Sequence, residues 1–347
     1  MNGQGTDRTT VTTENPTEAA DAPTADESGR HHTRTAGVVI GYDGSPESRL
    51  ALSWAAATAR RRGSRLTLLH SVNLSFIPGF PAFDTSQVEP ELQDAAKRLV
   101  DDGAMRAGDT LDASRIQTQY WLGSPAAQIV EASHDAELVV MGSRGRGRIT
   151  GGLLGSTSYA VAAHAHCPVV VVRPSHEAAA SADAEVPETA SLSEGLPEVV
   201  RPDATHPVVV GFDDSEPALR AVQAAADIAM EEGAELRIAH VVQVPSIDSW
   251  AYEETAHAGT VHAHSLREHA DDALSAAVRL AKSKHLELKV STEVLYGDPG
   301  QAIADLGRTA GLVVVGSRGR GGFKGLLLGS VSHNVIHNAE CPVMVVR

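Results

Sequence analysis

Short apolar runs alternate with longer helical patterns along two stretches of the chain. In the first stretch the apolar runs predict strands near residues 38–41, 66–72, 115–121, 138–141 and 169–173. The segments between them predict helices near residues 46–62, 88–107, 125–134 and 156–164. Strands that are apolar throughout are typical of a parallel sheet covered by helices on both faces, so this stretch predicts a parallel α/β sandwich.

The second stretch repeats this order of elements. Most equivalent positions lie 174 residues apart, as in the pairs Gly123 and Gly297, Pro125 and Pro299, and Cys167 and Cys341. The first predicted strands match at an offset of 170 residues, which places a four-residue difference in the middle of the repeat. We therefore expect two tandem five-stranded parallel α/β domains, repeat one at residues 36–173 and repeat two at residues 207–347.

The remaining segments, residues 1–35 and 174–206, are polar and acidic and lack hydrophobic periodicity. They predict a disordered tail and a flexible acidic linker. The chain of 347 residues has a net charge of −15, and these two segments carry −9 of it. The folded repeats are thus only mildly acidic, and no broad basic face is expected, which argues against nucleic-acid binding.

The lengths of the apolar runs and the positions of the two cysteines indicate the cellular compartment of the protein. The first 35 residues contain no apolar run of a signal peptide, and no run approaches the ~20 residues of a membrane helix. Cys167 and Cys341 occupy equivalent positions in separate repeats, so we expect both to be unbridged core residues. These patterns predict a cytoplasmic protein.

The same glycine-rich pattern, G-x2-G-x9-G-S, follows the fourth predicted strand of each repeat. It runs from Gly142 through Gly145 to Gly155-Ser156, and from Gly316 through Gly319 to Gly329-Ser330. Glycines let a backbone turn tightly and approach an anion, and the N–H groups at a helix start point at it. Positive charge is added by Arg144, Arg146, Arg148, Arg318 and Arg320. The pattern predicts a nucleotide phosphate site, made twice.

An aspartate ends the first predicted strand of each repeat, Asp43 in one and Asp213 in the other. In a doubly wound sheet this carboxylate lies beside the loop that follows the fourth strand. It can bind a ribose hydroxyl or a phosphate-bound cation, or it can cap the helix that follows. Asp214, where repeat one has Gly44, adds negative charge to the second site.

Other nucleotide and metal motifs are missing. The loops lack the Gly-Lys-Ser/Thr of a P-loop, and no G-x-G-x-x-G follows the first strand. The histidine and cysteine spacings match no standard zinc pattern, so no metal site of the protein's own is expected.

At these residues the chain resembles the universal stress protein family in its tandem, ATP-binding form. The resemblance covers both repeats and rests on Asp43 and Asp213, the two glycine-rich loops, and the closing runs that begin at Cys167-Pro168 and Cys341-Pro342. It implies a Rossmann-like, adenine nucleotide alpha hydrolase-like fold. It also implies that the residue after the histidine of the second strand, Ser71 or Val241, contacts adenine.

The pattern and the resemblance together predict two nucleotide sites. Site one comprises Gly41, Asp43, Ser71, Gly142, Ser143, Arg144, Gly145, Gly155 and Ser156. Site two comprises Gly211, Asp213, Val241, Gly316, Ser317, Arg318, Gly319, Gly329, Ser330, Val331 and Ser332.

Neither loop carries a positioned base for rapid phosphoryl transfer, so no catalytic residues are assigned. The leading hypothesis is a regulatory stress-response protein that binds ATP, with Mg²⁺ or Mn²⁺, and signals to a protein partner. The alternatives are a nucleotide-independent scaffold and, with less support, an ATP-pyrophosphatase-like adenylating enzyme. The last strands should pair with each other, giving an intrachain pseudo-dimer, and the whole chain can also form a homodimer.

Overall fold

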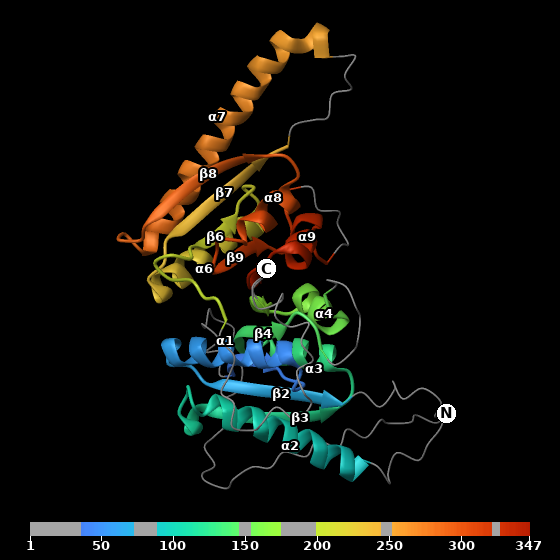
Figure 1. Ribbon diagram of the computed structural model, residues 1–347. Coiled ribbons are helices and arrows are strands. Elements are labelled where there is room, and N and C mark those ends of the chain that lie inside the picture. Colours follow the sequence, from blue (N-terminus) through green and yellow to red (C-terminus); the bar gives the residue numbers. More distant parts are fainter. Residues whose placement is uncertain (1–35, 73–88, 146–153, 175–198, 244–251, 321–326) are drawn as a thin grey trace, which may run out of the picture. The chain divides into compact units, whose positions relative to one another are not determined.

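The computed structural model describes residues 36–72, 89–145, 154–174, 199–243, 252–320 and 327–347 (Figure 1). The predicted tail, linker residues 175–198, Arg146 and Arg148 lie outside the described residues. Repeat one contains β1 (Gly37–Gly41), α1 (Pro46–Arg62), β2 (Leu66–Val72), α2 (Glu89–Ala107), a short 3-10 turn (Ala113–Arg115), β3 (Ile116–Leu122), α3 (Pro125–Ala132), β4 (Ala136–Gly142), α4 (Ser156–His164) and β5 (Val169–Val172). Repeat two contains β6 (Val208–Gly211), α6 (Glu216–Glu232), β7 (Leu236–Val242), α7 (Tyr252–Lys284), β8 (Val290–Tyr296), α8 (Pro299–Leu306), β9 (Leu312–Gly316), α9 (Ser330–Asn338) and β10 (Val343–Val346).

The described strands form one ten-stranded sheet with the order β3-β2-β1-β4-β5-β10-β9-β6-β7-β8. All pairings inside a repeat are parallel, as expected from the apolar strands. The chain order reverses between β1 and β4, and again between β6 and β9. A reversal of this kind leaves a crevice at the carboxyl ends of the two strands, and this is where open α/β sheets bind ligands.

Two apolar layers cover the sheet because successive side chains of a strand point to opposite faces. In β1, Val38 and Ile40 pack into the layer under α1 and α2, whereas Val39 packs into the layer under α3 and α4. The equivalent layers of repeat two lie under α6 and α7 and under α8 and α9. None of the described helices is long and apolar enough to span a membrane.

Local sequence signals place the helix ends where they were expected. Helix α1 begins after the cap Ser45 with Pro46 in its first turn, and it stops at Gly63, whose φ of 67° is left-handed. The middle of the repeats differs most, with 19 residues in α2 and 33 residues in α7. Both cysteines are buried and neither forms a disulfide, as predicted, and burial raises the pKa of the Cys341 thiol to about 12.

The last strands of the two repeats pair with each other, as the sequence predicted. Strands β5 and β10 are antiparallel, with Val343 opposite Val171. The arginine after each strand donates a hydrogen bond to the other repeat: Arg173 to the Ile336 carbonyl, and Arg347 to the Ala163 carbonyl.

Residues 199–206, expected to belong to a flexible linker, are instead anchored to the fold. The Arg201 guanidinium donates to the Trp54 carbonyl at 2.8 Å and to Glu232 at 2.5 Å, and it stacks 4.7 Å from the centre of the Trp54 ring. The sequence of the segment did not reveal this anchor, because the partners of Arg201 lie far away in the sequence.

Candidate functional site

The aspartate at the end of the first strand organises the turn that follows it. Asp213 Oδ1 accepts hydrogen bonds from the Ser215 backbone N–H at 3.1 Å and from its hydroxyl at 2.6 Å. Ser215 in turn caps α6, since its side chain accepts from the Ala218 N–H at 3.3 Å. Asp43 and Ser45 repeat this arrangement. The helix cap is therefore the serine, and the aspartate holds that serine in place rather than capping the helix itself.

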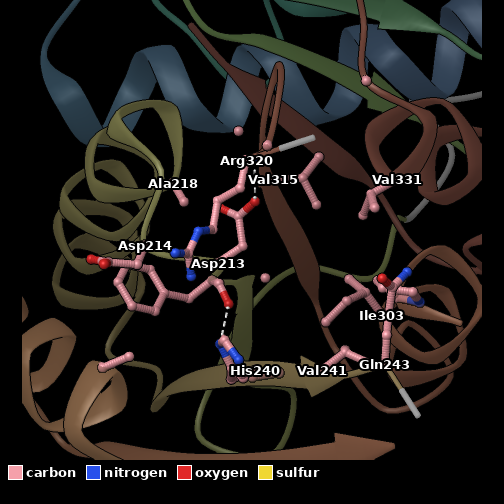
Figure 2. Close-up of a pocket in the computed structure, with 18 of the residues that line it drawn as sticks. Asp213, Asp214, Ala218, His240, Val241, Gln243, Ile303, Val315, Arg320 and Val331 are labelled. Atoms are coloured by element: carbon pink, nitrogen blue, oxygen red, sulfur yellow. Dashed lines mark hydrogen bonds between the residues drawn. The ribbon is translucent and has the colours of Figure 1, made fainter. Parts of the chain in front are cut away.

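The aspartate also faces the glycine-rich loop. Asp213 Oδ2 accepts from the Arg320 backbone N–H at 2.9 Å, and the dashed line in Figure 2 marks this bond. A Cβ atom on Gly145 would lie 2.7 Å from Asp43 Oδ2, and one on Gly319 would lie still closer to Asp213 Oδ2. The second glycine of the motif is thus needed because a carboxylate approaches it.

The first glycine of each loop is required for a different reason. A Cβ on Gly142 would lie 2.8 Å from the Glu47 carbonyl carbon, at the start of α1. None of the six described motif glycines adopts a left-handed φ. The first two glycines of each motif are therefore explained by close approach, of backbone at the first and of a carboxylate at the second, rather than by a left-handed turn.

The third glycine of each motif lies directly before a helix whose N-terminus faces the loop. Gly155 and Gly329 are the caps of α4 and α9, and neither cap makes a side-chain hydrogen bond. Each glycine N–H donates at 2.8 Å to the carbonyl of the loop serine, Ser143 or Ser317. The following N–H groups of the helix start are the donors that bind anions at helix N-termini.

In repeat two these elements surround a cavity of about 890 Å³. Of the residues predicted for site two, all but Ser317 line it. Ser317 is buried, and its backbone is tied to β10 and Gly329, so it shapes the loop from behind. Ser332 is also buried, and its hydroxyl donates to the Gly316 carbonyl at 2.6 Å, which fixes α9 against the loop.

The far end of the cavity lies at the second strand. His240 Nδ1 lies 2.8 Å from the Phe212 carbonyl oxygen, so the Nδ1–H tautomer donates and ties β7 to β6 (Figure 2). Val241 and Ile303 form an apolar wall on this side. In repeat one the residue equivalent to Val241 is Ser71, which is buried and donates its hydroxyl to the Gly123 carbonyl at 2.9 Å.

Several lining residues were missed by the sequence analysis. Helix α7 contributes Leu266, Ala270 and Ala273, and α8 contributes Pro299 and Ile303. The 266, 270, 273 spacing of small and apolar residues was a usable signal because it marks one face of a helix. That face lies in α7, in the part of the repeats that differs most in length. Among the described residues, no group of three or more His, Cys, Asp or Glu is arranged to hold a metal ion.

Comparison with known proteins agrees with this geometry. The model of the Universal stress protein family matches residues 37–173 and 204–347. The universal stress protein Rv2005c of Mycobacterium tuberculosis is 35% identical over 325 residues, covering 90% of this chain and 97% of the relative. Rv2623 of the same organism is 30% identical over 322 residues, covering 90% and 96%.

A solved structure supports the fold. The crystal structure of a universal stress protein from Archaeoglobus fulgidus superposes with a TM-score of 0.58 at 21% identity, covering 91% of this chain and 97% of that one. The two family matches, the tandem relatives and the shared fold together show that this chain belongs to the universal stress protein family and carries its domain twice.

Proposed function

We propose that each repeat binds one adenine nucleotide, ATP, and that the protein acts through this binding rather than by turning the nucleotide over. The observation that carries the proposal is the cavity of repeat two, where an aspartate, a glycine-rich loop and an open helix start converge at the carboxyl ends of β6 and β9. The phosphates would lie against the loop and the first turn of α9, and the base against Val241 and Ile303.

Repeat one carries the same elements in the same relation. Asp43 faces Gly145 as Asp213 faces Gly319, and Gly155 opens α4 as Gly329 opens α9. This duplication supports two sites per chain. Mg²⁺ or Mn²⁺ would enter with the phosphates and reduce their charge, with Asp213 and its counterpart Asp43 as the nearest strand-end carboxylates.

The residues around the cavity support binding over catalysis. A general base must be oriented toward the proton that it removes. Asp213 is engaged by Ser215 and Arg320. We therefore expect hydrolysis far below the ~1–100 s⁻¹ of kinases. A steady-state phosphate-release assay with magnesium or manganese measures this, and kinase-like turnover would favour the adenylating-enzyme alternative.

The regulatory part of the proposal is that nucleotide occupancy orders the loops and changes a surface that a protein partner reads. We place this activity in the cytoplasm, in keeping with two unbridged cysteines. A homodimer of the whole chain is compatible with the internal β5–β10 pairing, which uses the last strand of both repeats.

Nucleotide analysis of the purified, denatured protein tests the proposal. Release of adenine nucleotide in amounts approaching two molecules per chain is expected after loading with ATP. Failure to retain or bind any adenine nucleotide would instead support the nucleotide-independent scaffold.

A further inference from the structure

The arginine after the first two residues of the glycine-rich loop has different surroundings in the two repeats. In site one, Arg144 Nε lies 3.1 Å from Glu47 Oε1. The Glu47 side chain is 16% exposed and that of Arg144 is 39% exposed, so the carboxylate is the more enclosed partner. The positive charge that the loop offers to phosphate is therefore already matched by a negative one.

The equivalent position in site two holds no carboxylate. Gly142 approaches the backbone of Glu47, and Gly316 approaches the backbone of Pro217, which identifies the two residues as structural counterparts. Proline has no charge to offer. Within the described residues, no acidic side chain forms an ion pair with Arg318.

The other charges near the two loops do not reverse this difference. Burial and then Arg144 lower the pKa of Arg173 to about 10, and burial and then Arg318 lower the pKa of Arg347, so each loop arginine has a second arginine near it. Both sites also contain the strand-end aspartate.

Two further acidic residues, Asp214 and Glu216, follow Asp213 closely in the sequence of repeat two. Glu216 is paired with Arg220 and its side chain is 83% exposed. In Figure 2 the Asp214 carboxylate points away from Asp213 and Arg320. The carboxylate that engages a loop arginine is thus found at Glu47, and the described part of repeat two contains no match for it.

We propose that Glu47 is a specificity-determining residue that lowers the preference of site one for nucleotides with long phosphate chains. Site two, with an unmatched Arg318, favours ATP strongly over AMP, whereas site one favours it weakly. This inference rests on the proposed nucleotide binding. Its physical basis is that each added phosphate brings negative charge toward Glu47 and must compete with Glu47 for Arg144.

Calorimetric titration of single-site forms of the full chain tests the inference. Gly319→Glu leaves site one and Gly145→Glu leaves site two, because each added side chain would displace the facing aspartate. The ratio of the AMP and ATP dissociation constants is measured for each form. We expect the ratio to be larger for site two, by on the order of fivefold at low salt, and the difference to shrink as salt screens the charges.

Glu47→Gln in the Gly319→Glu background should raise ATP affinity on the order of fivefold with little change for AMP, which brings site one toward site two. The matched variant, Pro217→Glu in the Gly145→Glu background, should lower the ATP preference of site two. Equal ratios at the two sites, or a Glu47→Gln effect that is the same for AMP and ATP, would overturn the inference and leave the proposed function standing. Absence of adenine nucleotide binding at both sites in the unsubstituted chain would overturn both.

Discussion

The two repeats fold alike over cores of different chemistry. In repeat one, four polar side chains from the end of β1, from α1 and from α2 interact with one another, and their counterparts in repeat two are all apolar. The polar residues are Tyr42, Arg49, Asp102 and Arg106, and the apolar counterparts are Phe212, Leu219, Ala276 and Leu280.

Charge is buried in this quartet without complete compensation. Arg106 is 6% exposed and its Nε donates to Asp102 Oδ2 at 2.9 Å. Asp102 Oδ1 and Arg49 Nε are buried without a hydrogen-bond partner among the described residues. Burial raises the pKa of the Tyr42 hydroxyl, and Asp102 raises it further. Repeat two reaches the same sheet and the same site geometry with no such group, so the polar quartet is not needed for the fold.

Of the substitutions considered, removing one member of the quartet should lower the free energy of unfolding most. Asp102→Ala removes the carboxylate that accepts a hydrogen bond from the buried Arg106 guanidinium, and we expect it to lower the free energy of unfolding by about 3 kcal/mol. Urea denaturation measures the loss, and hydrogen exchange should assign it to repeat one. The matched control is Asp101→Ala, which breaks an exposed pair with Lys97 and should cost less than about 0.5 kcal/mol. Equal costs for the two variants would show that the quartet is solvated.

The contact between Arg201 and Trp54 is a second difference between the repeats. Trp54, on which Arg201 stacks, corresponds to Ala224 in repeat two. Arg201→Met removes hydrogen bonds to Trp54, Thr58 and Glu232, and it should cost about 2 kcal/mol in the same assay. Arg308→Met, which breaks exposed ion pairs, should cost below about 1 kcal/mol. A loss for Arg201→Met no larger than this control would contradict the anchor.

Replacing the whole quartet by its counterparts should reverse the effect of Asp102→Ala. The variant Tyr42→Phe, Arg49→Leu, Asp102→Ala and Arg106→Leu gives repeat one the side chains of repeat two. We expect a gain of about 1–2 kcal/mol in unfolding free energy, because apolar residues often replace buried ion pairs at no cost or with a gain. A loss as large as that of Asp102→Ala alone would mean that packing around Tyr42 and Gly103, rather than charge, distinguishes the repeats.

The smallest expected effect concerns the turn after the first strand. Asp214 has a φ of 62°, where repeat one places Gly44 at 76°. Asp214→Gly should relieve this left-handed strain and change the unfolding free energy of the chain by about 0.5 kcal/mol in the stabilising direction. Gly44→Asp in repeat one should be destabilising by a similar amount. Thermal denaturation of both variants checks the pair, and the same sign for both would contradict the equivalence of the two turns.

Sequence patterns predicted the fold well because its signals are local. The apolar runs, the cap Ser45 and the stop Gly63 each act within a few residues, and α1 begins and ends where they indicate. The edge pairing of β5 and β10 also followed from apolar runs that needed a partner. The anchoring of Arg201 could not be predicted, because its partners come from two distant helices.

The candidate site was only partly predictable for the same reason. The spacing of the loops placed Asp213, Gly319 and Gly329 around one cavity. The group that approaches each glycine in space could not be read from the spacing. The contrast between Glu47 and Pro217 depends on the approach of Gly142 and Gly316 to α1 and α6, which the spacing of the loop does not reveal.

Stoichiometry of ATP binding tests the central claim most directly. Calorimetric titration of the unsubstituted chain should give two ATP molecules per chain. The Gly145→Glu and Gly319→Glu variants should each give one, and the double variant none, because a carboxylate-bearing side chain would displace the aspartate and repel the phosphates. An unchanged stoichiometry in either single variant would contradict the account of one nucleotide site in each repeat.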